Sequence, residues 1–163
     1  QGILGMQHDL VGKKLFPYIS EQQQFEVMNS CYIQEVNDIK EAGGVLYQGL
    51  EATLKTLGNK YDLFIVSNCQ AGYIEAFYDY HGLSGYFKDF ECSGNTGLSK
   101  TENVKMVIDR NQLTKPIYIG DTMGDYTAAI GNAIPFVYAK YGFGDVPNAE
   151  YTIDKIEDLM DLL

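Results

Sequence analysis

Residues 116–125 read PIYIGDTMGD. A proline, three apolar residues and a glycine predict a short buried strand of the kind found in parallel sheets. Two aspartates follow four residues apart, Asp121 at the strand end and Asp125 at the expected start of a helix. Such a pair suits Mg²⁺, which takes few carboxylates together with waters and phosphate oxygens. On spacing alone, a helix start capped by Asp121 or Thr122 is an equally good interpretation.

Strand-like and helix-like segments alternate on both sides of this stretch. Strands are expected over 63–66, 87–92, 116–119, 135–139 and 151–153, and helices over 50–57, 71–80, 101–111, 126–132 and 156–163. This alternation predicts an α/β fold, a Rossmannoid parallel sheet with helices on both faces.

The first 43 residues carry helix signals and no convincing strand. Ser20 with Gln23 forms a capping-box pattern, and Gly43 stops the helix that follows. Between them, apolar residues recur every three or four positions and line one face of the predicted helix: Phe25, Met28, Tyr32, Val36 and Ile39. We therefore predict a helical unit over 1–44 and an α/β core over 45–163.

Polar residues follow the expected strands, where open α/β sheets bind their ligands. They are Ser67-Asn68, Ser93-Gly94-Asn95, and the two aspartates; Lys100 begins a helix soon after the second group. A hydroxyl beside free backbone N–H groups binds a phosphate oxygen, and a lysine neutralises a phosphoryl group. Each has an ordinary alternative: Ser67 or Asn68 as a helix cap, and Lys100 as a solvated surface lysine.

Composition narrows the class of protein. The 163 residues carry a formal net charge of −10, which argues against nucleic-acid and anionic-membrane partners. The three cysteines, Cys31, Cys69 and Cys92, include no CxxC pair, so we expect reduced thiols in a cytoplasmic protein. We see no leader pattern, and no apolar run approaches the roughly 20 residues of a membrane span.

The order of the polar segments resembles the second, third and fourth motifs of the haloacid dehalogenase (HAD) superfamily. These are the strand ending in Ser67-Asn68, then Gly-Leu-Ser-Lys at 97–100 with Asn103 three residues on, then the strand ending in Gly-Asp-Thr-x-x-Asp. Residues 129–135 followed by 141–144 are similar to the phosphoglycolate-phosphatase-like branch, and 47–50 to its entry into the core after a helical cap. The resemblance covers roughly residues 5–163.

The resemblance implies a Mg²⁺-dependent phosphatase that acts on a small phosphorylated metabolite through an aspartyl-phosphate. Ser67 would hydrogen-bond the transferring phosphoryl group, with backbone support from Asn68. Lys100 would stabilise that group and the nucleophile. Asp121 would ligate Mg²⁺ directly, and Asp125 would help through water or by orienting its neighbours. Residues 1–44 would be part of the helical cap.

One part of the family pattern is absent from the sequence. The family opens with an apolar strand ending in Asp-x-Asp, which supplies the nucleophile and the general acid/base. Here Asp9 has no apolar strand before it, Asp38 lies in a helix pattern, and Asp62 starts a strand. In the family this strand is central, between those ending at Ser67 and Asp121, so we expect two unpaired edges. The chain is then a fragment, or a separate N-terminal segment or a neighbouring molecule completes the sheet.

Three functional hypotheses follow. The first is a phosphatase of which this chain alone is an inactive, N-terminally truncated piece. The second is a catalytically inert HAD-like protein that binds phosphorylated ligands or a protein partner. The third is a HAD sugar-phosphate mutase or a dehalogenase. Hydrolytic dehalogenation needs no metal, so Mg²⁺ dependence would separate a dehalogenase from a phosphatase.

Overall fold

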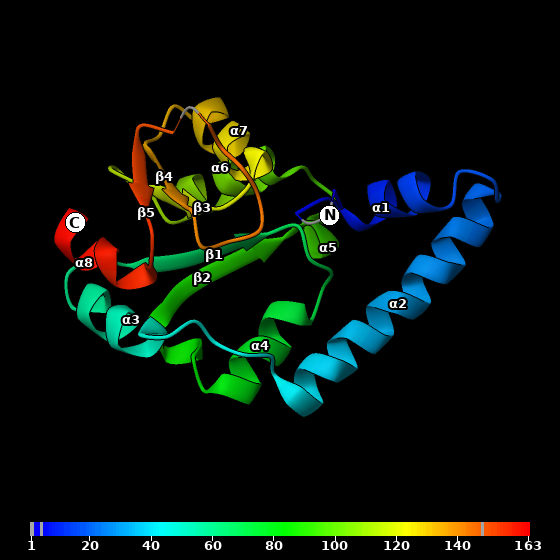
Figure 1. Ribbon diagram of the computed structural model, residues 1–163, viewed down its shortest axis with the longest axis horizontal. Helices are drawn as coiled ribbons and strands as arrows, with labels where there is room; N and C mark the ends of the chain where they lie inside the picture. Colours follow the sequence, from blue (N-terminus) through cyan, green and yellow to red (C-terminus); the bar gives the residue numbers. More distant parts are fainter. Residues whose placement is uncertain (1, 4, 148) are drawn as a thin grey trace.

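The computed structural model describes residues 2–3, 5–147 and 149–163. Strands and helices alternate after two N-terminal helices (Figure 1). In chain order the elements are α1 (His8–Leu15), α2 (Glu21–Ala42), α3 (Leu50–Gly58), β1 (Leu63–Ser67), α4 (Tyr73–His81), η1 (Ser84–Tyr86), β2 (Phe87–Cys92), α5 (Ser93–Thr96), α6 (Lys100–Arg110), β3 (Tyr118–Gly120), α7 (Met123–Gly131), β4 (Phe136–Ala139), β5 (Tyr151–Ile153), η2 (Ile156–Asp158) and α8 (Leu159–Leu162).

All strand pairs in the described residues are parallel, and they form two separate sheets. β1 pairs with β2, and β3, β4 and β5 pair in that order. Helices α3 and α4 lie on one side of the strands and α6 and α7 on the other (Figure 1). The predicted α/β fold is confirmed, as is the interruption of the sheet between the strands that end at Ser67 and Gly120.

A cavity of about 590 Å³ lies between β1 and β3. We call it the central slot. Its lining is mainly apolar and comes from both strands and from the helices above and below them; it includes Leu54, Ile65, Val104, Ile119 and Leu159. The free edges of β1 and β3 therefore face a gap with the character of a protein core.

Helix α6 joins the two sheets. It packs against β1 and β2 on one side and against α7, which follows β3, on the other. One apolar cluster contains Ile74, Tyr78 and Cys92, around β1 and β2. A second contains Val137, Ile153 and Leu159, around β4 and β5, and Leu63 of β1 packs against it.

The N-terminal helices form an arm that extends away from the sheets (Figure 1). The predicted capping box of α2 is confirmed, because Ser20 Oγ accepts a hydrogen bond from the Gln23 amide at 3.3 Å. Gly43 ends the helix with φ of 66°, a left-handed conformation that favours glycine. On the apolar face of this helix, Met28 and Val36 are buried, whereas Phe25 is 67% exposed. The division at residue 44 stays a prediction.

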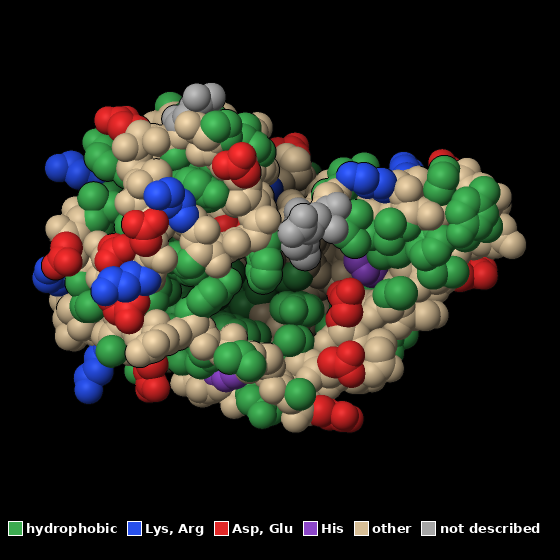
Figure 2. Space-filling model, viewed as in Figure 1, with side chains coloured by type: hydrophobic (Ala, Val, Ile, Leu, Met, Phe, Trp, Pro, Cys, Tyr) green, Lys and Arg blue, Asp and Glu red, His purple; other side chains and the backbone are tan. Residues whose placement is uncertain are grey.

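Figure 2 shows a hollow between this arm and the rest of the molecule, with hydrophobic side chains around it. Within the described residues, no helix has both the length and the apolar character needed to cross a membrane.

Candidate active site

Lys100 forms a buried ion pair with Asp125. Ser99 caps α6, with its Oγ accepting a hydrogen bond from the Glu102 amide at 3.3 Å, and this places Lys100 at the first position of the helix. Lys100 Nζ lies 2.5 Å from Asp125 Oδ1, and the two side chains are only 12% and 7% exposed. The interpretation of Lys100 as a solvated surface lysine is therefore wrong.

The other oxygen of Asp125 organises the turn before α7. Asp125 Oδ2 accepts hydrogen bonds from the Thr122 amide at 2.9 Å, the Thr122 hydroxyl at 2.7 Å and the Asp121 amide at 3.2 Å. Thr122 is the N-cap of α7, so the capping interpretation holds for this residue, and the helix starts at Met123, earlier than predicted. The same carboxylate thus caps a helix and binds the lysine.

These contacts keep Asp125 ionised. Burial raises the pKa of its carboxyl group, but the positive charge of Lys100 and the hydrogen bonds from Lys100 and Thr122 outweigh burial. The pKa of Asp125 is therefore below its usual value.

Asp121 is oriented by the loop after β4. Its Oδ2 accepts a hydrogen bond from the Phe143 amide at 2.7 Å. The backbone of Gly142 lies so close that an added Cβ would be 2.2 Å from Asp121 Cβ. Glycine at position 142 therefore lets the loop hold the carboxylate in place.

The carboxylate oxygens of Asp121 and Asp125 fit one hard cation that is bound through a single carboxylate. Both oxygens of Asp125 already accept hydrogen bonds from protein donors, whereas Oδ1 of Asp121 accepts none from the described residues. The described chain contains no cluster of three or more His, Cys, Asp or Glu side chains that would enclose a metal. Mg²⁺ tolerates such a sparse site, because it keeps several waters.

The Ser67 turn lies at the end of the other sheet. Ser67 Oγ accepts a hydrogen bond from the Cys69 amide at 3.2 Å, and helix α4 begins later with Gly72 as its N-cap. The interpretation of Ser67 or Asn68 as the cap of that helix is therefore wrong. Asn68 accepts from the Ser93 hydroxyl at 3.0 Å and donates to the Gly5 carbonyl at 2.7 Å.

Tyr118 connects the two sheets, and sequence reasoning missed it. Its hydroxyl, on β3, donates to the Val66 carbonyl on β1 at 3.1 Å and lies 3.4 Å from Asp125 Oδ1. Burial, followed by the charge of Asp125, raises the pKa of Tyr118 well above its usual value. A tyrosine within an apolar strand gives no sequence signal for a partner 52 residues away.

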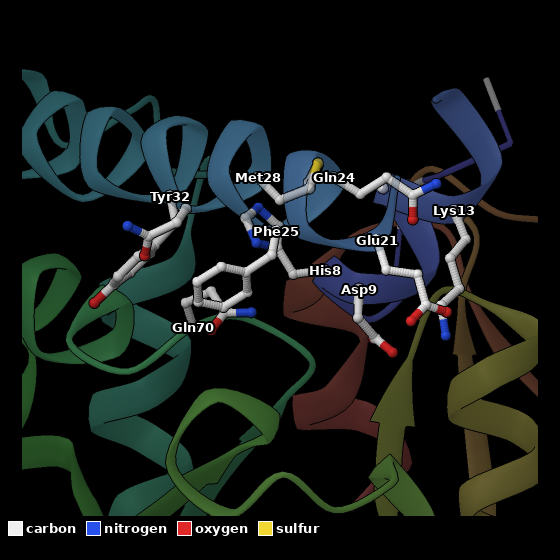
Figure 3. Close-up of a pocket in the computed structure, with 11 residues that line it drawn as sticks. His8, Asp9, Lys13, Glu21, Gln24, Phe25, Met28, Tyr32 and Gln70 are labelled. Carbon is white, nitrogen blue, oxygen red and sulfur yellow. The ribbon is translucent and has the colours of Figure 1, made fainter. Parts of the chain in front are cut away.

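The residue before α1 contacts the loop after β2. Gln7 Nε2 donates to the Leu98 carbonyl at 2.8 Å and to the Ser93 hydroxyl at 3.2 Å. Beyond it, a cavity of about 280 Å³ lies between α1, α2 and Gln70. Figure 3 shows Asp9, Lys13 and Glu21 reaching the same side of this cavity.

Ser67, Asn68, Lys100, Asp121 and Asp125 thus lie at the carboxyl ends of the strands or at the helix starts beside them. The structure links Lys100, Asp121 and Asp125 directly, and Tyr118 links Asp125 to the residue before Ser67.

Comparison with known proteins agrees with the family resemblance of the sequence motifs. The family model described as haloacid dehalogenase-like hydrolase matches residues 7–139. No curated protein sequence matches significantly.

Several solved structures share the fold. A predicted phosphatase from Clostridium acetobutylicum aligns with a TM-score of 0.81 and 20% identity, over 98% of this chain and 78% of that one. A predicted phosphoglycolate phosphatase from Haemophilus somnus aligns with a TM-score of 0.68 and 19% identity, over 87% and 64%. A magnesium-bound structure described as a HAD hydrolase from Bacillus subtilis aligns with a TM-score of 0.68 and 20% identity, over 96% and 78%.

At these identities the likeness shows a shared fold, whereas the family match extends over most of the sequence. The order of motifs read from the residues, the parallel α/β architecture and the family match agree: the chain belongs to the haloacid dehalogenase-like hydrolases.

Proposed function

We propose that this chain is the phosphate-binding and Mg²⁺-binding part of a phosphoric monoester hydrolase that acts on small phosphorylated metabolites. The observation that carries the proposal is the buried pair of Lys100 and Asp125. A lysine held at the strand ends by a carboxylate presents positive charge to an anion. A phosphate ester is a substrate that would use this charge, the Ser67 hydroxyl and a cation together.

Each residue has a defined part in the proposal. Ser67 and the backbone around Asn68 hydrogen-bond the phosphoryl oxygens, and Lys100 neutralises their charge. Asp121 is the direct ligand of Mg²⁺, because it retains a free oxygen, and Asp125 orients Lys100 and the Asp121 backbone. Bound Mg²⁺ would supply charge stabilisation for the transferring group.

The nucleophile enters on a β-strand that occupies the central slot. The support is geometric: a parallel strand between β1 and β3 would pair with two free edges and bury apolar side chains on both faces. Its carboxyl end would lie beside Ser67, Lys100 and Asp121. An aspartate there would attack phosphorus and form an aspartyl-phosphate that water then hydrolyses.

The test is to supply that strand. Asn68 donates to the Gly5 carbonyl, so the start of the chain lies at the rim where such a strand would end. We would fuse an apolar strand ending in Asp-x-Asp ahead of residue 1 through a short flexible linker. We expect Mg²⁺-dependent hydrolysis of p-nitrophenyl phosphate by the fusion, its loss in the fusion with Asp121→Asn, and little or none by the chain alone.

The matched control carries Asn in place of the first aspartate of the added motif. This strand fills the slot equally well, so it should raise the melting temperature as the active fusion does, but without turnover. Turnover by the chain alone would show that the nucleophile does not come from an added strand. A fusion that gains stability and binds phosphate without turnover would favour the inert binding protein. Halide release without Mg²⁺ would favour a dehalogenase.

A further inference from the structure

Two cysteines meet beneath the Ser67 turn. Cys69 follows Ser67 by two residues, and Cys92 is the last residue of β2, directly paired with Ser67 in the strand register. The Cys69 carbonyl accepts a hydrogen bond from the Gly94 amide at 3.0 Å, so the backbones remain joined past the strand ends. Both side chains pack in the same apolar cluster beside Ile74 and Leu83.

The two thiols lie close enough for each to shift the pKa of the other. The hydrogen bond from Cys69 lowers the pKa of Cys92 to about 7. The same contact, together with burial, raises the pKa of Cys69, because this thiol keeps its proton and donates it. Of the two thiols, Cys92 is therefore the one whose surroundings favour the thiolate, which is the reactive form of cysteine.

The three cysteines differ in access. Cys92 is fully buried, Cys69 is half-buried, and Cys31 is exposed on α2. Cys69 is therefore the more accessible thiol of the pair, and Cys92 lies deeper in the core. Cys31 lies on a different element and is an internal reference for ordinary thiol reactivity.

We propose that Cys69 and Cys92 are a reversible thiol modification site, which forms a disulfide and thereby changes phosphate binding at the Ser67 turn. With hydrogen peroxide, the S–S bond forms and the O–O bond breaks. The two thiols give up two electrons and two protons, and the products are the disulfide and two molecules of water. A dithiol reductant reverses the change by thiol–disulfide exchange and becomes oxidised itself.

The site is coupled to phosphate binding because the Ser67 turn depends on the position of Cys69. The Cys69 amide donates to Ser67 Oγ, and Asn68 is held to Ser93, the residue after Cys92. A disulfide requires the two sulfurs to approach to about 2.0 Å, closer than thiol contact. Drawing Cys69 toward β2 moves the donor on Ser67 and changes the groups that face phosphate. This coupling rests on the proposed function; disulfide formation does not.

Peptide mapping of the full chain tests the disulfide directly, because trypsin places each cysteine in a different peptide: 15–40, 61–88 and 89–100. The native chain is treated with hydrogen peroxide, free thiols are blocked with N-ethylmaleimide, and the digest is analysed by mass spectrometry without reduction. We expect 61–88 linked to 89–100 with the loss of two hydrogens, Cys31 blocked, and full reversal by dithiothreitol.

Cysteine variants test which two thiols form the disulfide. Cys31→Ser should leave the linked peptide unchanged, and Cys69→Ser, at a half-buried position, should abolish it. Links that involve Cys31, or peroxide treatment that leaves Cys69 and Cys92 both open to blocking, would overturn the proposal.

Binding of inorganic phosphate, measured by ³¹P NMR with Mg²⁺ present, tests the coupling. We expect a severalfold rise in the phosphate Kd on oxidation, reversed by dithiothreitol and absent from Cys69→Ser. A disulfide that forms without changing the Kd would overturn the coupling. Failure of the reduced chain to bind phosphate would instead contradict the proposed function, while the peptide map would still decide the disulfide.

Discussion

Strands β1 and β4 have similar apolar sequences, LFIVS and FVYA, but they differ in how far their residues are buried. All four residues of β4 are buried, because β3 and β5 flank it. All five residues of β1 are partly exposed, because β2 covers one edge and the central slot adjoins the other. An apolar run predicts a strand, but its burial is set by neighbours that the run itself does not specify.

The same contrast extends to the chemistry at the strand ends. The β1–β2 sheet ends in uncharged groups, Ser67, Asn68 and Ser93, whereas the β3–β4–β5 sheet ends in Asp121 and leads into Asp125. One half is suited to hydrogen-bonding an anion and the other to a cation. Lys100, carried by the helix that packs against both halves, pairs with Asp125 beside the second sheet.

Removing that charge should have the largest effect. Lys100→Met leaves Asp125 buried without its cation, and breaking a buried pair costs about 3–5 kcal/mol of unfolding free energy. Urea unfolding measures the loss. Lys105→Met is the control, because its pair with Asp109 is on the exposed surface of the same helix and should contribute no more than about 1 kcal/mol. Equal losses in the two variants would contradict the buried pair.

A smaller effect is expected from a substitution beside Asp121, which should affect only the sheet formed by β3, β4 and β5. Gly142→Ala places a methyl group against Asp121, and overpacking of this kind costs about 1–3 kcal/mol. Mg²⁺ binding, followed by calorimetry, should weaken because the carboxylate moves. Gly58→Ala is the control, since an added Cβ there meets nothing within 4 Å, and it should be neutral or stabilising. Unchanged Mg²⁺ affinity in Gly142→Ala would argue against Asp121 as the ligand.

The hydrogen bond that joins the two sheets, from Tyr118 to Val66, should contribute less than either of these contacts. Tyr118→Phe removes the hydrogen bond to the Val66 carbonyl, which should lower the unfolding free energy by about 0.5–1.5 kcal/mol. Tyr80→Phe, at an exposed position, should change it by less than about 0.5 kcal/mol. If Tyr118→Phe matches this control, the hydroxyl contributes nothing to joining the halves.

The smallest expected effect is a difference between wild type and Lys100→Met in how the unfolding free energy changes in acid. The folded-state pKa of Asp125 is below its unfolded value, so its contribution is present above about pH 4 and is lost as pH falls further. In dilute solution, wild-type stability should fall below about pH 4 more steeply than that of Lys100→Met, which lacks the charge that lowers the pKa. Parallel pH profiles would mean that Lys100 does not shift the Asp125 carboxyl.

The sequence predicted those features whose causes are local. The capping box at Ser20, the stop at Gly43 and the strand ending at Gly120 depend on residues within a few positions of one another. It did not predict that Phe25 is exposed, because the regular spacing on α2 defines a face without saying what covers it. The last predicted helix divides into η2 and α8.

The candidate site was predictable as a set of residues but not as a network. Lys100 and Asp125 were recognised by their places in the motif order, although the capping and surface interpretations could not be separated from the functional ones by spacing. The structure shows that Asp125 takes part in the capping box of α7 and also pairs with Lys100. Tyr118 and Gln7 could not be found, because their partners are distant in the sequence and depend on how the strands meet.

The open edges of β1 and β3 should also affect how copies of the chain meet in concentrated solution. An unpaired edge is a template for the edge of another copy. Near pH 7 the net charge of −10 keeps copies apart by repulsion, but this repulsion vanishes near the isoelectric point of about 4.5. Aggregation should therefore increase as the pH approaches that value, and a strand in the central slot should suppress it by covering both edges.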